Sequence, residues 1–194
     1  MVNNSGIIRE LMKFDSENEF YFLQILSRKK DNPDQSKGLI VIKSYYIYSL
    51  DQFDGILSEV IKICESTNSR AYFRLNKRDD SKVGLQMIKK ISDHLINGNS
   101  RSLKNVYDSV VGEFSHDSDK TWLIDIDTHD REFINSIKFD LESLQYFAKK
   151  EPLLIEIPSK NGVHIITRPF NPNKLKEKWN VDIHKDNPTC LYIP

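Results

Sequence analysis

The chain has 194 residues, enough for one domain with a substantial core. Its 28 lysines and arginines balance its 28 aspartates and glutamates, which argues against a protein that coats nucleic acid through bulk charge. Cys64 and Cys190 form no C-x-x-C pair, which argues against a disulfide framework or a zinc ribbon. No segment approaches the roughly 18 apolar residues of a membrane span, so we expect a cytoplasmic protein with no membrane partner.

The N-terminal part of the chain, residues 1–115, predicts a smaller αβ unit. Two runs rich in aromatic and β-branched residues flank a polar turn, and two later segments repeat apolar residues at helical spacing. The expected elements are a strand, a strand, a helix, a strand and a helix, over Glu19–Arg28, Gly38–Ser49, Asp51–Ser66, Arg70–Asn76 and Val83–Leu95. Residues 99–120 are polar and give no assignment.

The C-terminal part, residues 116–194, predicts an RRM-like lobe. Its expected elements are a strand, a helix, a hairpin, a short helix, a strand and a last strand, over Thr121–Asp127, Asp130–Lys149, Leu153–Pro158 with Val163–Pro169, Pro172–Trp179, about Val181, and Cys190–Ile193. The first five follow the order of a βαββαβ unit, in which two helices cover one face of a mostly antiparallel sheet. We therefore expect an α+β fold whose second sheet leaves one face for a site.

Two aspartates end the apolar strand TWLIDID. Asp125 and Asp127 are two residues apart, so both carboxylates project from one face of the strand, as a pair that shares divalent cations requires. Close carboxylates repel each other unless a cation neutralises them. The alternative is that both leave the strand for solvent and that Asp127 or Thr128 caps the next helix.

The hairpin around SKNGVH adds a second group of polar side chains. If Asn161-Gly162 forms a type I′ turn, Ser159 lies directly across from His164, and Arg168 shares their face. Together with Lys160 and the amides of the turn, this group suits a polyphosphate. The alternative is a surface histidine beside an ordinary turn.

Two further features depend on how the chain folds. Asp182 is a third carboxylate if its strand reaches the first two. The cations between Arg70 and Lys104, among them Arg74, Lys77 and Arg78, suit a phosphate backbone beside an acidic pocket, or else form a solvated face.

Together these sites resemble the three motifs of the archaeo-eukaryotic primase superfamily (primase-polymerases), in a small catalytic-core form of the kind that phages and mobile elements encode. The matching residues are the D-h-D pair Asp125 and Asp127 at the end of an apolar strand, Ser159 and His164 on a hairpin, and Asp182 on a later strand. The segment Arg70–Arg78 also looks like the run that leads into the first motif. The resemblance covers about Arg70 to the C-terminus.

The resemblance implies a primase-polymerase catalytic core that carries out template-dependent nucleotidyl transfer. Asp125, Asp127 and Asp182 would bind two Mg²⁺ or Mn²⁺ ions for in-line displacement at the α-phosphate of a nucleoside triphosphate. His164, with Ser159, Lys160 and Arg168, would hold the triphosphate. Implied partners are a single-stranded DNA template and a helicase or second primase subunit, with Arg74, Lys77 and Arg78 as weaker candidates for contacts to nucleic acid.

Other readings of the D-x-D pair remain open. A metal-dependent glycosyltransferase also places D-x-D after an apolar strand, but that reading leaves SKNGVH without a role. A haloacid-dehalogenase-like phosphatase has a threonine two positions after its second aspartate, whereas Thr128 is adjacent to Asp127. A polymerase-β-like transferase has a Gly-Ser ahead of its D-x-D, which is missing here, and an HD phosphohydrolase reading of His129-Asp130 lacks the other helical metal ligands. The non-enzyme alternative is a catalytically silent primase-like protein that binds a nucleotide or single-stranded nucleic acid.

Overall fold

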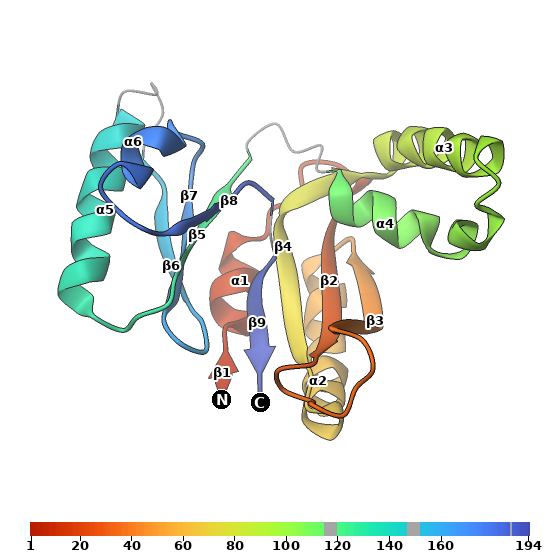
Figure 1. Cartoon of the computed structure of the whole chain (residues 1–194), viewed down its shortest axis with the longest axis horizontal. Coiled ribbons are helices and arrows are strands. Elements are labelled where there is room, and N and C mark those ends of the chain that lie inside the picture. The colour runs from red at the N-terminus through yellow and green to blue at the C-terminus, as the bar shows by residue number, and fades with distance from the viewer. Residues whose placement is uncertain (115–119, 147–151, 187) are drawn as a thin grey trace.

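The computed structural model of the chain describes residues 1–114, 120–146, 152–186 and 188–194. Its elements, labelled in Figure 1, are β1 (Val2–Asn3), α1 (Ser5–Leu11), β2 (Glu19–Arg28), β3 (Leu39–Ile47), α2 (Leu50–Thr67), β4 (Arg70–Asp79), α3 (Asp80–Ile96), the 3₁₀ helix η1 (Ser100–Asn105), α4 (Val106–Glu113), β5 (Trp122–Ile126), α5 (Arg131–Tyr146), β6 (Leu154–Pro158), β7 (Val163–Thr167), α6 (Pro172–Lys176), β8 (Asp182–His184) and β9 (Thr189–Ile193). The predicted α+β class is confirmed. The end of the helix expected over Asp130–Lys149 lies outside the described residues.

The strands form two antiparallel sheets. The first has the order β1-β9-β4-β2-β3 and the second the order β6-β7-β5-β8. In the second sheet β5 lies between β7 and β8 and runs antiparallel to both, while β6 and β7 form the expected hairpin. With α5 and α6 as its connections, this sheet has the predicted βαββαβ order.

The last strand corrects the predicted division of the chain at residue 116. β9 was expected in the lobe formed by residues 116–194, but it pairs with β4 and β1 of the first sheet. All five of its residues are buried, so no alternation of polar and apolar positions indicates which sheet the strand should join. The chain therefore crosses from the first sheet to the second before β5, and returns between β8 and β9.

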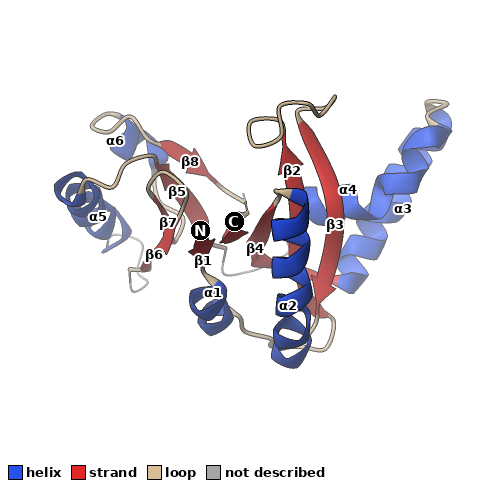
Figure 2. Ribbon diagram, turned by 90° about the horizontal axis from the view of Figure 1, so that it is seen from below, coloured by secondary structure: helices blue, strands red, loops and turns tan. Residues whose placement is uncertain are grey.

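Helices cover the outer faces of the two sheets (Figures 1 and 2). Side chains from α5 and α6 pack against one face of the second sheet, around Ile124, Ile126 and Ile165. α2 packs on one face of the first sheet. This helix has Ser49 as its N-cap and Asn68, in the left-handed conformation, as its C-cap. The α2 core also contains side chains from the inner face of the second sheet, so one hydrophobic core joins the two sheets.

A pair of helices, α3 and α4, lies beside the first sheet and projects from it (Figure 1). Their inner face packs on Phe20 and Phe22 of β2. The 3₁₀ helix η1 and α4 fill most of the stretch, residues 99–120, that the sequence left unassigned, while α3 contains the helix predicted over Val83–Leu95. No helix of the described residues is both long and apolar enough to cross a membrane.

A buried asparagine at the end of β4 fastens both crossings between the sheets. Asn76 is 3% exposed, and its Oδ1 accepts hydrogen bonds from the backbone N–H (2.7 Å) and the hydroxyl (3.0 Å) of Thr121, just before β5. Its Nδ2 donates to the Thr121 carbonyl (3.0 Å) and to the Asp186 carboxylate (3.0 Å), just after β8. One side chain therefore holds the chain at both points where it passes between the two sheets.

A buried arginine strengthens this junction. Arg78 is fully buried, and its guanidinium donates to the Val111 carbonyl at 2.8 Å and to the Asp186 carboxylate at 2.8 Å. Arg74 also binds Asp186, through that residue's backbone carbonyl. Since a buried charge is costly unless it is paired, Asp186 and the arginines depend on one another.

We expect Asn76→Ala to lower the free energy of unfolding by about 2 to 3 kcal/mol, because it leaves buried backbone and carboxylate groups without partners. Chemical denaturation would measure the loss. The control is Asn99→Ala at an exposed loop position, for which we expect a change within about 0.5 kcal/mol. Equal stability of the two variants would show that Asn76 does not fasten the crossings.

Candidate functional site

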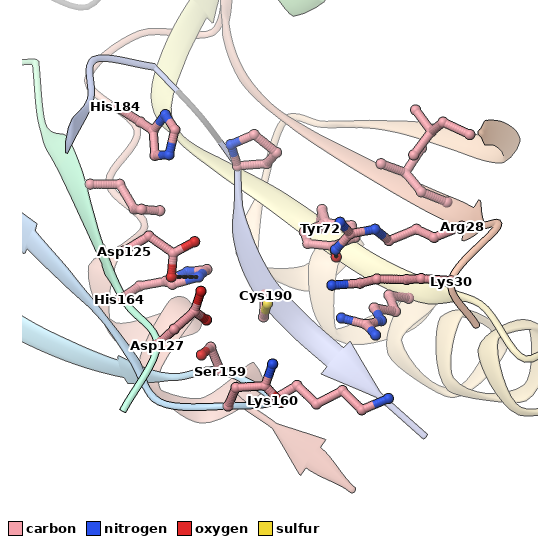
Figure 3. Close-up of a pocket in the computed structure, with 16 residues that line it drawn as sticks. Arg28, Lys30, Tyr72, Asp125, Asp127, Ser159, Lys160, His164, His184 and Cys190 are labelled. Atoms are coloured by element: carbon pink, nitrogen blue, oxygen red, sulfur yellow. Dashed lines mark hydrogen bonds and ion pairs between the residues drawn. The ribbon is translucent and has the colours of Figure 1, made fainter. Parts of the chain in front are cut away.

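A cleft of about 380 Å³ lies between the two sheets. Figure 3 shows its two walls facing each other, with Cys190 of β9 between them. The second sheet contributes Leu123, Asp125, Asp127, Ser159, Lys160, Asn161, His164 and His184, and the first sheet with its loops contributes Leu26, Arg28, Lys30, Leu39, Arg70, Tyr72 and Cys190. One wall is thus rich in acids and histidines, and the opposite wall is rich in cations.

The central strand of the second sheet brings the predicted acidic residues together. Asp125 of β5 is directly opposite His164 of β7 on one side and Asp182 of β8 on the other. Residues opposite each other in neighbouring strands project from the same face. Asp127, one residue beyond the end of β5, also lines the cleft. The structure therefore gathers Asp125, Asp127, Asp182 and His164 at one end of this sheet.

The aspartates are poorly compensated by other side chains. His164 Nε2 lies 3.5 Å from Asp125 Oδ1, and among the described residues no lysine or arginine forms an ion pair with Asp125, Asp127 or Asp182. All three carboxylates also line a shallow cavity of about 280 Å³ beside the cleft. Carboxylates that are close and unpaired favour a divalent cation.

The fit to a metal ion is best for two of the three carboxylates. Asp125 and Asp127 both line the main cleft, and the side chain of Asp125 is 34% exposed. Asp182 lies at an exposed position of the short strand β8. Within the described ranges, no group of three or more histidine, cysteine, aspartate or glutamate side chains is placed to hold a metal ion as it stands. Asp125 and Asp127 are therefore the ligands that this arrangement offers first.

His164 is held between the two sheets. Its ring is buried, with Nδ1 hydrogen-bonded to the hydroxyl of Thr189 in β9 at 2.9 Å and Nε2 facing Asp125. Burial holds the pKa of His164 below its ordinary value, opposed by the negative charge of Asp125, while the neighbouring His184 lowers that pKa further. The imidazole is therefore neutral at pH 7, and Thr189 sets its orientation.

The register of the hairpin differs from the prediction. Ile157, and not Ser159, lies opposite His164, and Pro158 lies opposite Val163. The Ser159 N–H donates to the Gly162 carbonyl at 2.9 Å, so the turn is centred on residues 160–161 and no type I′ turn forms at Asn161-Gly162. Ser159 still lines the cleft, because it is two residues after Ile157.

Gly162 explains this correction. Neither Asn161 nor Gly162 has the positive φ that a type I′ turn needs. Instead, the backbone at Gly162 lies against the end of β5, where an added Cβ would be 2.6 Å from the Thr128 nitrogen and 2.8 Å from its carbonyl oxygen, and closer still to the Ile126 oxygen. The glycine permits the hairpin to approach the segment that contains Asp127.

Arg168 is not brought to the cleft. It lies beyond the far end of β7 and lines a different cavity, of about 330 Å³, together with Lys13 and Lys77. Alternation along a strand correctly places Arg168 on the face of His164, but four residues of extended chain separate the two by roughly 13 Å.

The three cations predicted to contact nucleic acid have partners inside the protein. Arg74 and Arg78 hold Asp186 at the junction between the sheets. Lys77 is 8% exposed and pairs with Asp15 and Glu19. None of the three cations lines the cleft. Their spacing in the sequence gave no sign of this, because the partners come from distant segments.

In the basic wall, Arg28 and Lys30 were not predicted as part of the site, whereas Arg70 belongs to the cation-rich stretch expected beside the acidic pocket. Arg28 donates to the Tyr72 hydroxyl at 2.9 Å, and Arg70 binds Asp31. Burial lowers the pKa of Lys30, and the charges of Arg28 and Arg70 lower it further, against smaller opposing effects of Asp31 and Asp127. Positive charges are therefore crowded here, and an anion would relieve their repulsion.

Two signals in the sequence point to this wall. Arg28 and Lys30 are two residues apart, with Lys29 between them, at the end of one predicted strand, and Arg70 begins another. Alternation places such residues on one face of a sheet, but only the pairing of Leu26 with Arg70 shows that the two strands are neighbours. His184, which the sequence gave no role, also faces the cleft.

No family model, curated protein or solved structure matches this chain. The function therefore has to be argued from the cleft itself.

We expect Gly162→Ala to cost about 1 to 3 kcal/mol of unfolding free energy, since the new methyl group meets backbone atoms that cannot move aside easily. The matched control is Gly55→Ala in α2, where nothing lies within 4 Å of an added Cβ. That change should be neutral or stabilise by up to about 1 kcal/mol. Thermal denaturation of both variants tests the close approach; a Gly162→Ala protein as stable as the control would contradict it.

Proposed function

We propose that the cleft binds a nucleoside triphosphate and that the protein transfers the nucleotide to the 3′-hydroxyl of a nucleic acid strand, as DNA primases and polymerases do. The observation that carries this proposal is the pairing of an acidic wall with a basic wall across one cleft. Carboxylates suit divalent cations, while guanidinium and ammonium groups suit a polyphosphate. Nucleotidyl transfer needs both within one site.

In this proposal Asp125 and Asp127 hold Mg²⁺ or Mn²⁺, and Asp182 is the third carboxylate near them. When bound, such ions supply charge neutralisation at the phosphates and activation of the 3′-hydroxyl. Asp125 itself would orient the reacting groups, because it lies on β5, whose register is set by β7 on one side and β8 on the other.

The basic wall would hold the triphosphate. Arg28, Lys30 and Arg70 line the cleft opposite the aspartates. Lys160 extends from the hairpin turn toward the first sheet, where its ammonium lies 3.4 Å from Asp31. With the phosphates held by the basic wall, the 3′-hydroxyl gives up its proton to water, its oxygen attacks the α-phosphorus, and the bond from the α-phosphorus to the bridging oxygen breaks. Pyrophosphate leaves with the bridging oxygen, toward the arginine and lysine side chains of the basic wall.

The architecture supports the same proposal. A βαββαβ sheet that faces a second antiparallel sheet is compatible with an RRM-like lobe of a primase-polymerase core. The template would be a single DNA strand whose bases pair with the incoming nucleotide, so the protein needs few contacts to base edges. A helicase or second primase subunit would be its replication partner, and the cytoplasm its location.

The test is incorporation of labelled nucleotides on primed and unprimed single-stranded DNA, with Mg²⁺ or Mn²⁺. We expect extension of the primed template by the natural protein and loss of incorporation in the Asp125→Asn/Asp127→Asn variant, whose amides cannot replace two anionic ligands. Products on the unprimed template would make the protein a primase.

The matched control is Asp34→Asn/Asp51→Asn, which removes the same charge at two positions outside the cleft. Equal incorporation by the two double variants would contradict the role of the aspartates. Absence of incorporation by the natural protein, with triphosphate binding retained, would favour the silent binding protein over the enzyme.

Lys30 makes the affinity for a triphosphate depend on pH. A bound anion favours the charged lysine, so affinity is complete below the pKa of Lys30 and falls as the pH rises through it. Because that pKa is lowered, the fall should begin at a lower pH than an ordinary lysine would give. Calorimetric titration at a series of pH values from neutral up to the ordinary lysine pKa of about 10.4 measures this fall.

Lys30→Arg is the informative variant, since a guanidinium stays charged throughout that range. We expect its affinity to be nearly independent of pH, and Lys30→Gln to bind weakly at every pH. If Lys30→Arg showed the same decline as the natural protein, another group would be responsible for the pH dependence.

A further inference from the structure

One carboxylate joins cations from the two walls of the cleft. Asp31, in the loop between β2 and β3, lies with its Oδ1 2.5 Å from the Arg70 guanidinium and 3.4 Å from the Lys160 ammonium. Arg70 begins β4 of the first sheet, and Lys160 belongs to the β6–β7 turn of the second. Asp31 is therefore a bridge between the sheets at the cleft.

The bridge uses only one of the two carboxylate oxygens. Asp31 Oδ2 is buried and accepts no hydrogen bond from the described residues. An ionised carboxylate can accept about four hydrogen bonds, and a buried acceptor left without a donor costs stability. Asp31 thus binds its two cations less completely than a group with more oxygens could.

The backbone of Asp31 is held by other groups. The side chain of Asn68 donates to the Asp31 carbonyl at 2.7 Å, and the side chain of Asn32 donates to the Asn68 carbonyl at 2.9 Å. Asn68 owes its position to the left-handed C-cap of α2. The loop therefore keeps its anchor when the Asp31 side chain releases its cations.

We propose that Asp31 is an internal counter-ion which a ligand phosphate displaces from Arg70 and Lys160. This inference rests on the proposed function, because it takes the ligand to be a polyphosphate. Asp31 occupies the cations, and the entering phosphate takes its place between the two sheets.

Charge favours the exchange. A phosphate group offers about two negative charges and three acceptor oxygens, against one charge and one bonded oxygen from Asp31. The crowded cations Arg28 and Lys30 lie on the same wall and gain a partner as well. Burial raises the pKa of Asp31, but hydrogen bonds from Arg70 and Lys160 outweigh burial and hold that pKa below its ordinary value, so the competitor stays charged at pH 7.

Displacement would also make the site selective. A ligand with a single weak charge competes poorly with a carboxylate already in place, whereas a polyphosphate replaces it and gains further cations. Because Lys160 is 54% exposed and Arg70 is buried, Lys160 is the cation free to follow the phosphate.

The experiment is calorimetric titration of the full chain with inorganic tripolyphosphate in the absence of metal. Asp31→Asn keeps the shape of the side chain but removes the competing charge, and we expect about three- to tenfold tighter binding. The matched control is Asp34→Asn, the same change at an exposed position of the same loop, which should alter affinity less than about twofold.

Further variants keep the test decisive. Thermal denaturation verifies that Asp31→Asn is folded, and Asp31→Ser replaces it if it is not. In the Lys160→Gln background the gain from Asp31→Asn should shrink, because one of the two released cations is missing.

Weaker binding by Asp31→Asn, or a gain no larger than that of Asp34→Asn, would overturn the proposal and make Asp31 a positioning residue or a bystander. In either case binding by the natural protein leaves the proposed function standing. If neither the natural protein nor the variants bind tripolyphosphate, the counter-ion role fails, and the incorporation assay with Mg²⁺ or Mn²⁺ decides separately whether the proposed function stands.

Discussion

The arrangement of the whole molecule depends on a buried polar junction at the end of β4. Asn76 and Arg78 bind the backbone and carboxylate groups at the two points where the chain crosses between the sheets. Hydrophobic contacts bring two sheets together without specifying their angle or offset, because burial of apolar surface has no direction. Hydrogen bonds to Thr121 and Asp186 supply that direction, and so set the distance between the walls of the cleft.

The chemistry of the cleft follows from this arrangement. Each wall carries neighbouring charges that repel one another: the carboxylates of Asp125 and Asp127 on the second sheet, and the crowded side chains of Arg28, Lys30 and Arg70 on the first. A ligand that is an anion and arrives with a divalent cation compensates both walls at once. Burial raises the pKa of the Cys190 thiol, which also lines the cleft, to about 11, and this disfavours the nucleophilic thiolate at pH 7.

Local patterns predicted most of the elements, and the reason is visible in each. Helices such as α2 carry their own caps and an apolar face, and the strand that ends in Asp125 and Asp127 is short, apolar and bounded by polar residues. The same kind of pattern misled at Asn161-Gly162, whose composition favours a turn with positive φ. There the backbone of Gly162 lies close against Thr128, and this contact outweighs the local preference for a type I′ turn.

By itself, the sequence determined the class of fold and the order along the chain of the elements that form the second sheet. It also determined the faces on which Asp125, Asp127, Ser159 and His164 lie, since these features depend on periodicity over a few residues. Only the tertiary structure decided which strands outside the β6–β7 hairpin are neighbours. In the folded chain β9 pairs within the first sheet, and Arg168 lies away from the site. Arg74, Lys77 and Arg78 have partners inside the protein, and Arg28, Lys30 and Arg70 lie opposite the aspartates. Pairing between distant segments leaves no trace in local spacing, because its free energy comes from contacts that exist only once the chain is folded.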